Sequence, residues 1–314
     1  MSLASAFAYA SANLLAKRGM VRSNSQSGGV FVSLSVNALL SVFIYLAVIL
    51  LSSLPKMTAS GIIWFVVSGL CTSFLGRILL YPAIRYIGGF RVSTIIQGLI
   101  PFFVSVIAYF VLGESLALAS LLGMLLIVSG LFVMLRSRMT NEVPSVDDMN
   151  DDIPRKERRG SGGLKFVSSP LVQGAVFGVF ASLAYAFGSV LRKLALRDLP
   201  DPFFGALIGG LVGFAFFFVL MIFNEGARVD FRETFEKVNP WFYFAGALMT
   251  LGQLFNFISL FYIDVIRTSL IASSEIVFSV LLSAVFFRVS ESIHFQVVLS
   301  SFLVFCGTVL VILS

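Results

Sequence analysis

Long apolar runs alternate with short polar connections along most of the chain. Most runs are about 20 residues long, the length that a helix needs to cross a bilayer core of about 30 Å. The pattern predicts an all-α polytopic membrane protein with ten spans. The expected spans are Ser2–Ala16, Gly29–Leu51, Gly61–Tyr81, Val92–Leu112, Leu116–Leu135, Ser169–Leu191, Pro202–Phe223, Pro240–Tyr262, Thr268–Phe287 and Ile293–Leu313.

Composition excludes a water-soluble fold. Hydrophobic residues make up 58% of the 314 positions and charged residues only 12%, with a mean hydropathy of +0.98. Soluble domains carry about 25% charged residues. Cys71, Cys306 and the single His294 are far apart in sequence, so we expect neither a metal site nor a disulfide. We also expect no cofactor. The net charge of +6 then reflects membrane topology rather than a nucleic-acid partner.

One hydrophilic stretch, from Arg136 to Lys165, interrupts the apolar pattern. It holds an acidic cluster followed by a basic one and cannot bury enough apolar surface to order itself. We expect it to tether two halves, which divides the chain into residues 1–135, 136–168 and 169–314. Its basic cluster could also contact anionic lipid headgroups.

The two halves resemble each other at an offset of 176 residues. The offset aligns Tyr185 with Tyr9, Lys193 with Lys17, Gly252 with Gly76, Gln253 with Arg77, and Arg267 with Arg91. Five helices per half is an odd number, so the second half must enter the membrane from the opposite face. The chain is therefore expected to form two inverted five-helix repeats, an arrangement in which transporters bind solute between the halves.

Two short motifs in the first half carry a family resemblance. They are the run Gln97–Pro101 and the run Leu112–Leu116, which contains Gly113-Glu114. The chain resembles the EamA-like ten-helix branch of the drug/metabolite transporter superfamily. The family pattern places Glu-Pro before the Gly-Glu motif; here Ile100 replaces that Glu, whereas the second half keeps it as Glu275 and lacks the Pro. The resemblance implies transport of amino acids, drugs, sugars or nucleotide sugars.

Glu275 is the one carboxylate that lies deep in an apolar run, about 12 Å along its helix from Arg267. A charged residue there costs at least about 2.5 kcal/mol and normally faces a wet cavity or the bundle interior. Its helical face also carries Thr268, Ser279 and Ser283. We expect Glu275 to bind the solute or a coupling proton. The alternative is a protonated carboxyl group that only bonds a neighbouring helix.

Other polar residues within the spans extend this expected site. Ser93, Gln97, Pro101 and Ser105 share one face, and Pro101 frees a backbone carbonyl. Gln253 and Asn256 either line the cavity or join helices. Arg77 either snorkels to the interface, binds an anionic group or pairs with Glu275. The expected solute-binding residues are Tyr9, Asn13, Arg77, Tyr81, Gln97, Gln253, Asn256 and Glu275.

Small residues and loop charges give weaker indications. Gly205, Gly209 and Gly213 are spaced by four, which favours close helix packing, or alternatively a dimer seam. We expect a monomer or a weak homodimer. Residues 224–239 suggest a short helix on the membrane surface. Loop charges place both termini outside the cytoplasm, whereas several relatives that the chain resembles have the reverse orientation.

The expected function is alternating-access transport of a small organic metabolite across a bacterial inner or plasma membrane, without enzymatic chemistry. The mixed charges favour an amino-acid-like or other zwitterionic solute, with export as the expected direction. Glu275 is the candidate for proton coupling. Two alternatives remain: a flippase for a lipid-linked sugar or polyprenyl phosphate, and a non-transporting membrane scaffold.

Overall fold

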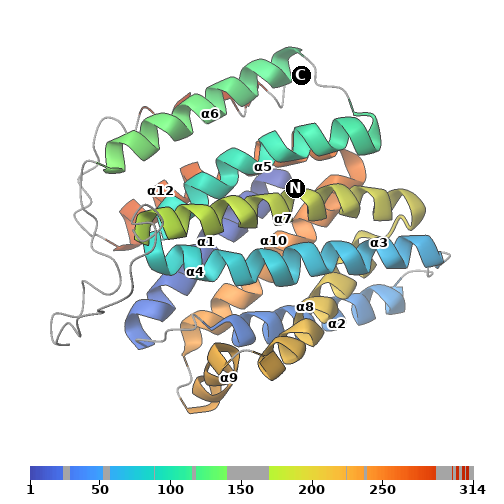
Figure 1. The fold of residues 1–314 in the computed structure, drawn as a ribbon. Coiled ribbons are helices and arrows are strands. Elements are labelled where there is room, and N and C mark those ends of the chain that lie inside the picture. The colour runs from blue at the N-terminus through green and yellow to red at the C-terminus, as the bar shows by residue number, and fades with distance from the viewer. Residues whose placement is uncertain are drawn as a thin grey trace, which may run out of the picture.

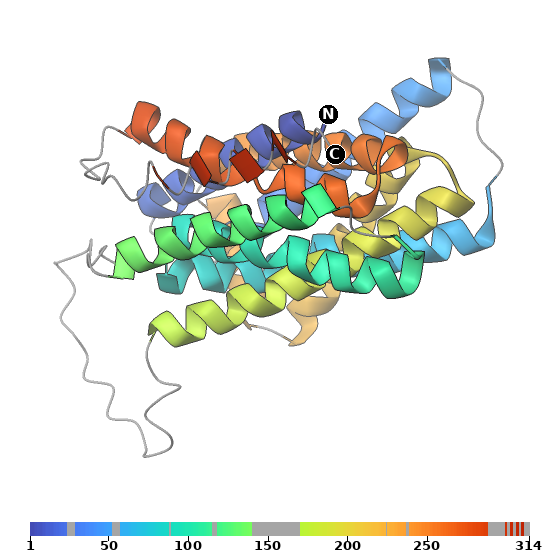
Figure 2. The ribbon, with the colours of Figure 1, turned by 90° about the horizontal axis from the view of Figure 1, so that it is seen from above.

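The computed structural model describes residues 1–23, 29–51, 57–87, 89–114, 118–139, 170–223, 225–236 and 239–287, and scattered positions between 299 and 310. Within these ranges every regular element is a helix, and most helices lie along a common direction (Figures 1 and 2). The elements are α1 (Ser2–Ser23), α2 (Val30–Leu51), α3 (Ala59–Gly69), the π-helical η1 (Leu70–Gly76), α4 (Arg77–Ile87), α5 (Gly89–Leu112), α6 (Leu118–Met139), α7 (Pro170–Asp198), α8 (Pro202–Phe223), α9 (Glu225–Glu236), α10 (Pro240–Tyr262), α11 (Val265–Ala272) and α12 (Glu275–Phe287).

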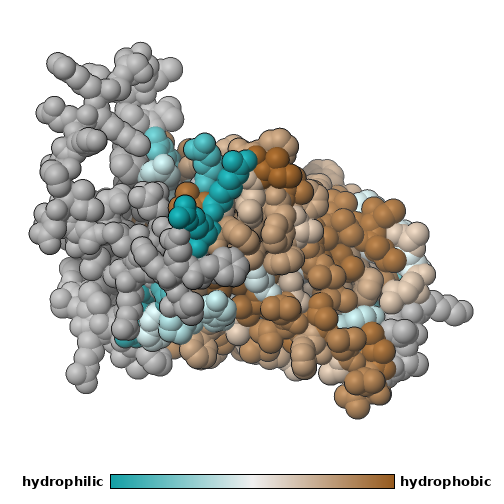
Figure 3. All heavy atoms as spheres, turned by 90° about the horizontal axis from the view of Figure 1, so that it is seen from below, coloured by the Kyte–Doolittle hydropathy of each residue, from teal (hydrophilic) through white to brown (hydrophobic). Residues whose placement is uncertain are grey.

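Six helical stretches among the described residues are long and apolar enough to cross a membrane. They are Val30–Leu51, Ala59–Ile84, Ile95–Leu112, Val172–Asp198, Pro202–Phe223 and Pro240–Tyr262. Apolar side chains cover most of the described surface on the face seen in Figure 3. The chain is thus a multi-pass membrane protein, and the described residues do not confirm the expected count of ten spans. Helix α6 includes the first four residues of the hydrophilic middle, whereas the rest of that stretch, and nearly all of the expected tenth span with His294, lie outside the described residues.

Helix α1 is not among the six because its sequence is polar, and α10 compensates for that polarity. The Ser5 hydroxyl donates to the Gly252 carbonyl (2.8 Å), and the hydroxyls of Ser2 and Ser259 bond each other. Polar groups away from water need such partners. The first helix is therefore held by its neighbours, as its composition predicts.

The two halves interlock through their first helices. In the first half, α1 packs along α10, α11 and α12 of the second half. In the second half, α7 packs along α3, η1, α4 and α5 of the first. Figure 1 shows α7 running beside α5 and the long rod of α3, η1 and α4. Each half thus contributes its first helix to the other half's bundle.

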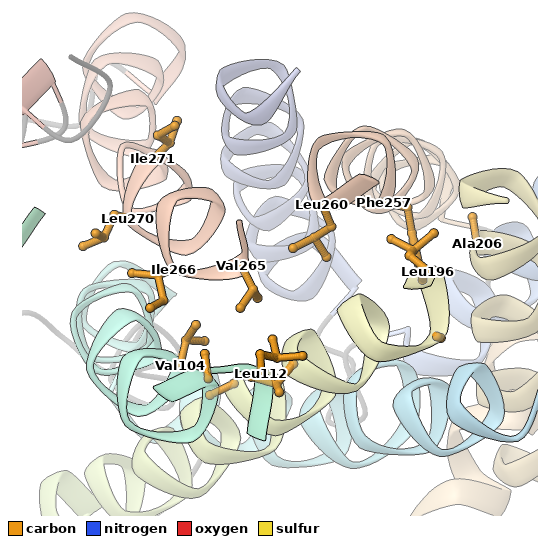
Figure 4. Packing of buried hydrophobic residues seen from close by; sticks show 14 of the residues in the cluster. Val104, Leu112, Leu196, Ala206, Phe257, Leu260, Val265, Ile266, Leu270 and Ile271 are labelled. Atoms are coloured by element: carbon orange, nitrogen blue, oxygen red, sulfur yellow. The ribbon is translucent and has the colours of Figure 1, made fainter. Parts of the chain in front are cut away.

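Apolar clusters lie along this interface. The largest, seen in Figure 4, brings together side chains from α5, α7, α8, α10 and α11. A second joins α1, α2, α4, α5, α7 and α10. The clusters bury residues such as Phe257, Leu260 and Val265 in the first and Ala83 and Val92 in the second. Both clusters contain residues of both halves and so hold the halves together.

Glycines let the helices approach closely. Along α8, an added Cβ would lie 2.6 Å from the Phe65 ring at Gly205, 2.8 Å from Gln253 at Gly209 and 2.9 Å from Ser73 at Gly213. These three glycines therefore pack α8 against other helices of the same chain, as the packing interpretation of their spacing predicts. Nothing in these contacts needs a second copy.

Several predicted boundaries were wrong. Three spans end six or seven residues later than expected: α1 continues to Ser23, the third span passes through Pro82 to Ile87, and α7 reaches Asp198. Proline is tolerated inside transmembrane helices because neighbouring groups satisfy the freed carbonyl. The ninth span is not one helix, because a turn at residues 273–274 separates α11 from α12.

The expected surface helix is present as α9 (Glu225–Glu236). Its Phe231 packs onto Phe31 of α2, with ring centroids 4.8 Å apart. Part of its apolar face therefore docks on the bundle.

Candidate functional site

A cavity of about 130 Å³ lies between the two halves. Its walls come from α1, η1, α4 and α5 of the first half and from α7, α10, α11 and α12 of the second. The lining residues are Tyr9, Asn13, Thr72, Ser73, Arg77, Leu80, Ile96, Gln97, Ile100, Tyr185, Ser189, Arg192, Met249, Gln253, Asn256, Leu260, Val265, Thr268, Ser269, Ala272 and Glu275. All the predicted site residues except Tyr81 are among them. Tyr81 is buried in the second apolar cluster instead, so its predicted contact with a solute stays untested.

Many lining residues are repeat partners of one another, separated by 176 positions. The pairs are Tyr9 and Tyr185, Asn13 and Ser189, Ser73 and Met249, Arg77 and Gln253, Leu80 and Asn256, and Ile96 and Ala272. Equivalent positions of the two repeats therefore face one space. The three charged positions break this symmetry. Arg77 aligns with Gln253, Arg192 with Ala16, and Glu275 with an apolar residue, Leu99 at this offset or Ile100 in the family motif.

A reciprocal contact shows the same relationship in packing. A Cβ added to Gly76 would lie 2.7 Å from the Tyr185 ring, and one added to Gly252 would lie 3.1 Å from the Tyr9 ring. Gly76 and Gly252 are repeat partners, as are Tyr9 and Tyr185. Each ring lies on the glycine of the opposite half, so both glycines shape the cavity wall.

Glu275 begins α12, immediately after the break in the ninth span, and is only 3% exposed. Asn13 of α1 donates to its Oε1 (2.8 Å), and the side-chain amide of Gln97 donates to Oε2. Each carboxyl oxygen thus has an amide partner from the first half. This geometry agrees with both interpretations of Glu275, as a group that lines the cavity and as a carboxyl group that bonds neighbouring helices.

Pro101 allows α5 to form a hydrogen bond with the turn between α11 and α12. In an α-helix the carbonyl of Gln97 would accept the N–H of residue 101, but proline has none. The Ser273 hydroxyl donates to that carbonyl instead, at 2.9 Å. The carbonyl that the sequence predicts to be free is therefore used between the halves. Ser105 donates to the Pro101 carbonyl of its own helix (2.7 Å) and does not line the cavity.

Arg77 lies directly after the π-helical turn η1 and is 5% exposed. Bonding from i to i+5 places residues five apart on nearly the same face, so Thr72, Ser73 and Arg77 all reach the cavity. The guanidinium donates to the Ser33 hydroxyl (3.2 Å). Snorkelling to the interface is excluded by this burial. Within the described residues this guanidinium therefore bonds a hydroxyl group, and no hydrogen bond to the Glu275 carboxylate is seen there.

Arg192 is the main site residue that sequence reasoning missed. It is 6% exposed on α7 and lines the cavity. Its Nη1 donates to Asn256 (3.2 Å) and its Nη2 to Thr72, while the guanidinium carbon lies 4.6 Å from the centroid of the Phe257 ring. Its Nε has no hydrogen-bond partner among the described residues. The predicted span ended at Leu191, which placed Arg192 in a loop.

Gln253 and Asn256 combine both predicted roles. Gln253 accepts from Asn37 of α2 (3.1 Å) and donates weakly to the Ala206 carbonyl of α8 (3.4 Å). Asn256 accepts from Arg192. Both residues also line the cavity, so they join helices while presenting polar atoms to it.

Glu114 explains the Gly-Glu motif of the first half. Gly113 ends α5 with φ of +69°, a left-handed value that favours glycine, and the Glu114 N–H bonds back to the Ala108 carbonyl (3.4 Å). The Glu114 carboxylate then accepts from the first two N–H groups of α11, those of Val265 and Ile266, both at 3.3 Å. Burial raises the pKa of Glu114, while these hydrogen bonds oppose the rise.

Lys193 makes a similar link in the same region. Its Nζ donates to the carbonyls of Leu260 and Ile263 at the end of α10, both at 2.8 Å. The connection between α10 and α11 is thus held from α5 by Glu114 and from α7 by Lys193. Because Leu260 and Val265 line the cavity, these links fix one of its walls.

Among the described residues, no group of three His, Cys, Asp or Glu side chains could hold a metal ion. The cavity offers guanidinium, amide, hydroxyl, phenol and carboxyl groups. Such groups recognise a polar solute by charge and hydrogen bonds.

Comparisons with known proteins agree with this fold. A search of curated protein sequences finds no match. Among solved structures 28 chains match. One, described only as the crystal structure of a protein, has a TM-score of 0.57 and 14% sequence identity, with 98% of this chain and 96% of that chain covered. Such low identity supports the fold alone. The EamA-like transporter family matches residues 1–136 and 172–313, one match in each half. The chain therefore belongs to the EamA-like transporter family.

Proposed function

We propose that the protein carries a small polar organic solute across the membrane by alternating access, with the cavity between its halves as the binding site. The main support for this proposal is that equivalent positions of both repeats line one cavity. Arg77, Arg192 and Glu275 add charges to this cavity that have no charged counterpart in the other repeat. Family membership supports transport of small solutes rather than enzymatic catalysis.

Our proposal includes ten spans in two inverted five-helix repeats. The reciprocal packing of α1 and α7, and the exchanged contacts of Tyr9 and Tyr185, support a two-fold relationship between the halves. In transporters of this architecture one unit rocks against the other around a fixed site. A monomer suffices for this motion, and a weak homodimer is compatible with it.

Glu275 is the proposed proton-coupling group. It is buried, lines the cavity and bonds Asn13 and Gln97 of the opposite half. A change in its protonation alters those bonds between the halves. Proton binding at this position would thereby bias the equilibrium between cavity orientations.

The proposed solute is amino-acid-like or another zwitterion, and export is the proposed direction, in a bacterial inner or plasma membrane. Acidic and basic side chains in one cavity support a solute that carries both charges. The volume of about 130 Å³ supports a small metabolite, since one liquid water occupies about 30 Å³. A flippase for a polyprenyl phosphate needs room for a much longer ligand, and a scaffold needs no polar cavity.

The first experiment is a thermal-shift screen of purified protein against amino acids, sugars, nucleotides and polyprenyl phosphates at two pH values. A ligand that binds the native state raises the melting temperature by mass action. Stabilisation by a water-soluble compound supports transport of that class. Stabilisation by polyprenyl phosphates alone supports the flippase.

The second experiment measures uptake of the stabilising solute into proteoliposomes with and without an imposed pH gradient. Proton coupling predicts faster uptake with the gradient, and Glu275→Gln should abolish that acceleration. The matched control is Glu225→Gln on the exposed helix α9, outside the cavity. Equal rates with and without the gradient in the wild type would indicate facilitated diffusion instead.

A further inference from the structure

Two buried guanidinium groups face the cavity near each other. Arg77 is 5% exposed and Arg192 is 6% exposed, and both line the same cavity of about 130 Å³. A buried charge is costly unless it is paired. Within the described part of the chain the hydrogen-bond partners of these guanidiniums are neutral groups: Ser33 for Arg77, and Asn256, Thr72 and the Tyr9 phenol for Arg192.

Glu275 does not neutralise this pair of cations. Its two carboxyl oxygens are taken by the amides of Asn13 and Gln97. With Glu275 ionised the three groups sum to one positive charge, and with Glu275 protonated to two. Either state leaves excess positive charge in a cavity of low dielectric, where an anion is strongly favoured.

The guanidinium of Arg192 is held in one orientation. One face stacks on the Phe257 ring at 4.6 Å, and its two terminal nitrogens are fixed by Asn256 and Thr72. Its Nε–H has no hydrogen-bond partner in the part of the chain that the structure describes, although the residue is more than nine-tenths buried. A fixed, planar donor with an unsatisfied N–H is suited to oxyanion recognition.

Two hydroxyl groups of the lining also lack partners. The Oγ of Ser73 and the Oγ1 of Thr268 are buried and make no hydrogen bond to any residue that the structure describes. Buried polar atoms normally have partners, and orphaned ones need an explanation. Ser73 adjoins Thr72, which fixes Arg192, and is four residues from Arg77.

We infer that the cavity holds an oxyanion subsite, formed by Arg192 and Arg77, that binds the carboxylate or phosphate group of the transported solute. This inference rests on the proposed function and narrows its solute class. A neutral sugar or a simple amine is then a poor solute. A zwitterion is accepted through its acid group, and a solute with two acid groups gains most.

The test compares matched compounds that differ in one acid group, using the full-length wild-type protein in detergent. The pairs are L-glutamate and L-glutamine, L-phenylalanine and its amide, and glycerol 3-phosphate and glycerol. The melting temperature is measured for each compound up to 10 mM. The subsite predicts that stabilisation is lost or weakened about tenfold or more when an acid group is removed. The first two pairs report carboxylate and the third reports phosphate.

Variants locate the effect. Arg192→Gln should weaken binding of the stabilising anion about tenfold or more, with Arg192→Lys intermediate, because lysine keeps the charge but loses the planar fork. The control is Arg18→Gln, which lies outside the cavity beside Trp241. If Arg192→Gln does not fold, the wild-type pairs still decide the matter.

Three results would overturn the subsite: equal stabilisation by both members of every pair, stabilisation by neutral compounds alone, or no shift with any anion. They are distinguishable from a failure of the proposed function. Proteoliposomes that take up a neutral solute in a Glu275-dependent way keep the transporter and reject the subsite. A cavity that is never accessible from both membrane faces rejects the transporter itself.

Discussion

Ser273 donates a hydrogen bond to the main-chain carbonyl of Gln97 at 2.9 Å, and the two residues are 176 positions apart, which makes them repeat partners. A contact between equivalent positions marks the point where the two halves meet. It exists because Pro101 leaves that carbonyl without its helical donor. In the same region the side-chain amide of Gln97 donates a hydrogen bond to Glu275. The turn that interrupts the ninth span and Pro101 of the fourth span therefore form one structural unit.

Removing the Ser273 hydroxyl should destabilise the protein through the Gln97 carbonyl. Ser273→Ala leaves a buried acceptor unsatisfied, at a cost of about 1–3 kcal/mol. In a Pro101→Ala background the cost should fall by more than half, because an alanine at position 101 supplies the missing helical N–H. A double-mutant cycle of unfolding measurements in detergent checks this. An equal cost in both backgrounds would contradict the pairing.

The two reciprocal glycines should differ in their tolerance of alanine. At Gly76 the added Cβ lies 2.7 Å from the Tyr185 ring, so the ring must move, whereas at Gly252 the corresponding distance to Tyr9 is 3.1 Å. We expect Gly76→Ala to lower solute uptake about tenfold, as for 1–3 kcal/mol of overpacking, and Gly252→Ala to lower it less.

The control for the glycines is Gly178→Ala, whose Cβ would meet a methyl group of Ile95 at 3.2 Å, away from the cavity. Uptake and melting temperature are measured for all three variants. Wild-type uptake by Gly76→Ala would mean that the position of Tyr185 does not matter for transport.

The raised pKa of Glu114 predicts a pH dependence of stability. Burial, the main cause, makes the folded protein hold this proton more tightly than the unfolded chain does. The stabilising contribution is therefore fully present below the unfolded pKa of 4.5 and is lost as pH rises through the folded pKa. The melting temperature of the wild type should fall over this window.

Glu114→Gln should flatten that part of the pH profile, because the amide does not titrate. Glu225→Gln on α9 serves as the exposed control and should leave the slope unchanged. Melting curves from pH 4 to pH 8 provide the comparison. A profile of Glu114→Gln that overlays the wild type after a constant offset would assign the slope to another group.

Helix boundaries followed the sequence where local signals agreed. Asp201 caps α8 by accepting from the N–H groups of Phe203 and Phe204, both at 3.0 Å, and proline occupies the first helical position. Asn239 and Pro240 begin α10 in the same way. Both helices have the predicted bounds because cap, proline and apolar run coincide.

Arg192 escaped prediction because an apolar-run criterion ends a span at its first charges. Helix α7 instead continues to Asp198, and the charge is accommodated by Asn256, Thr72 and the Phe257 ring. These partners come from other helices and leave no local signature.

The repeat offset could have predicted cavity residues that the choice of polar residues within the spans did not find. Tyr185 and Ser189 line the cavity, and the offset relates them to Tyr9 and Asn13, which were predicted. The π-helical turn before Arg77 and the break before Glu275 had no such signal. Both depend on contacts between the halves rather than on local propensity.

Alternating access through the cavity is tested most directly by the accessibility of position 189. Ser189→Cys is placed in a protein whose Cys71 and Cys306 are replaced by alanine, and sealed vesicles are treated with a membrane-impermeant thiol reagent from one face at a time. We predict labelling from each face in turn, with protection by the transported solute. Labelling from one face only, under every condition, would contradict the account.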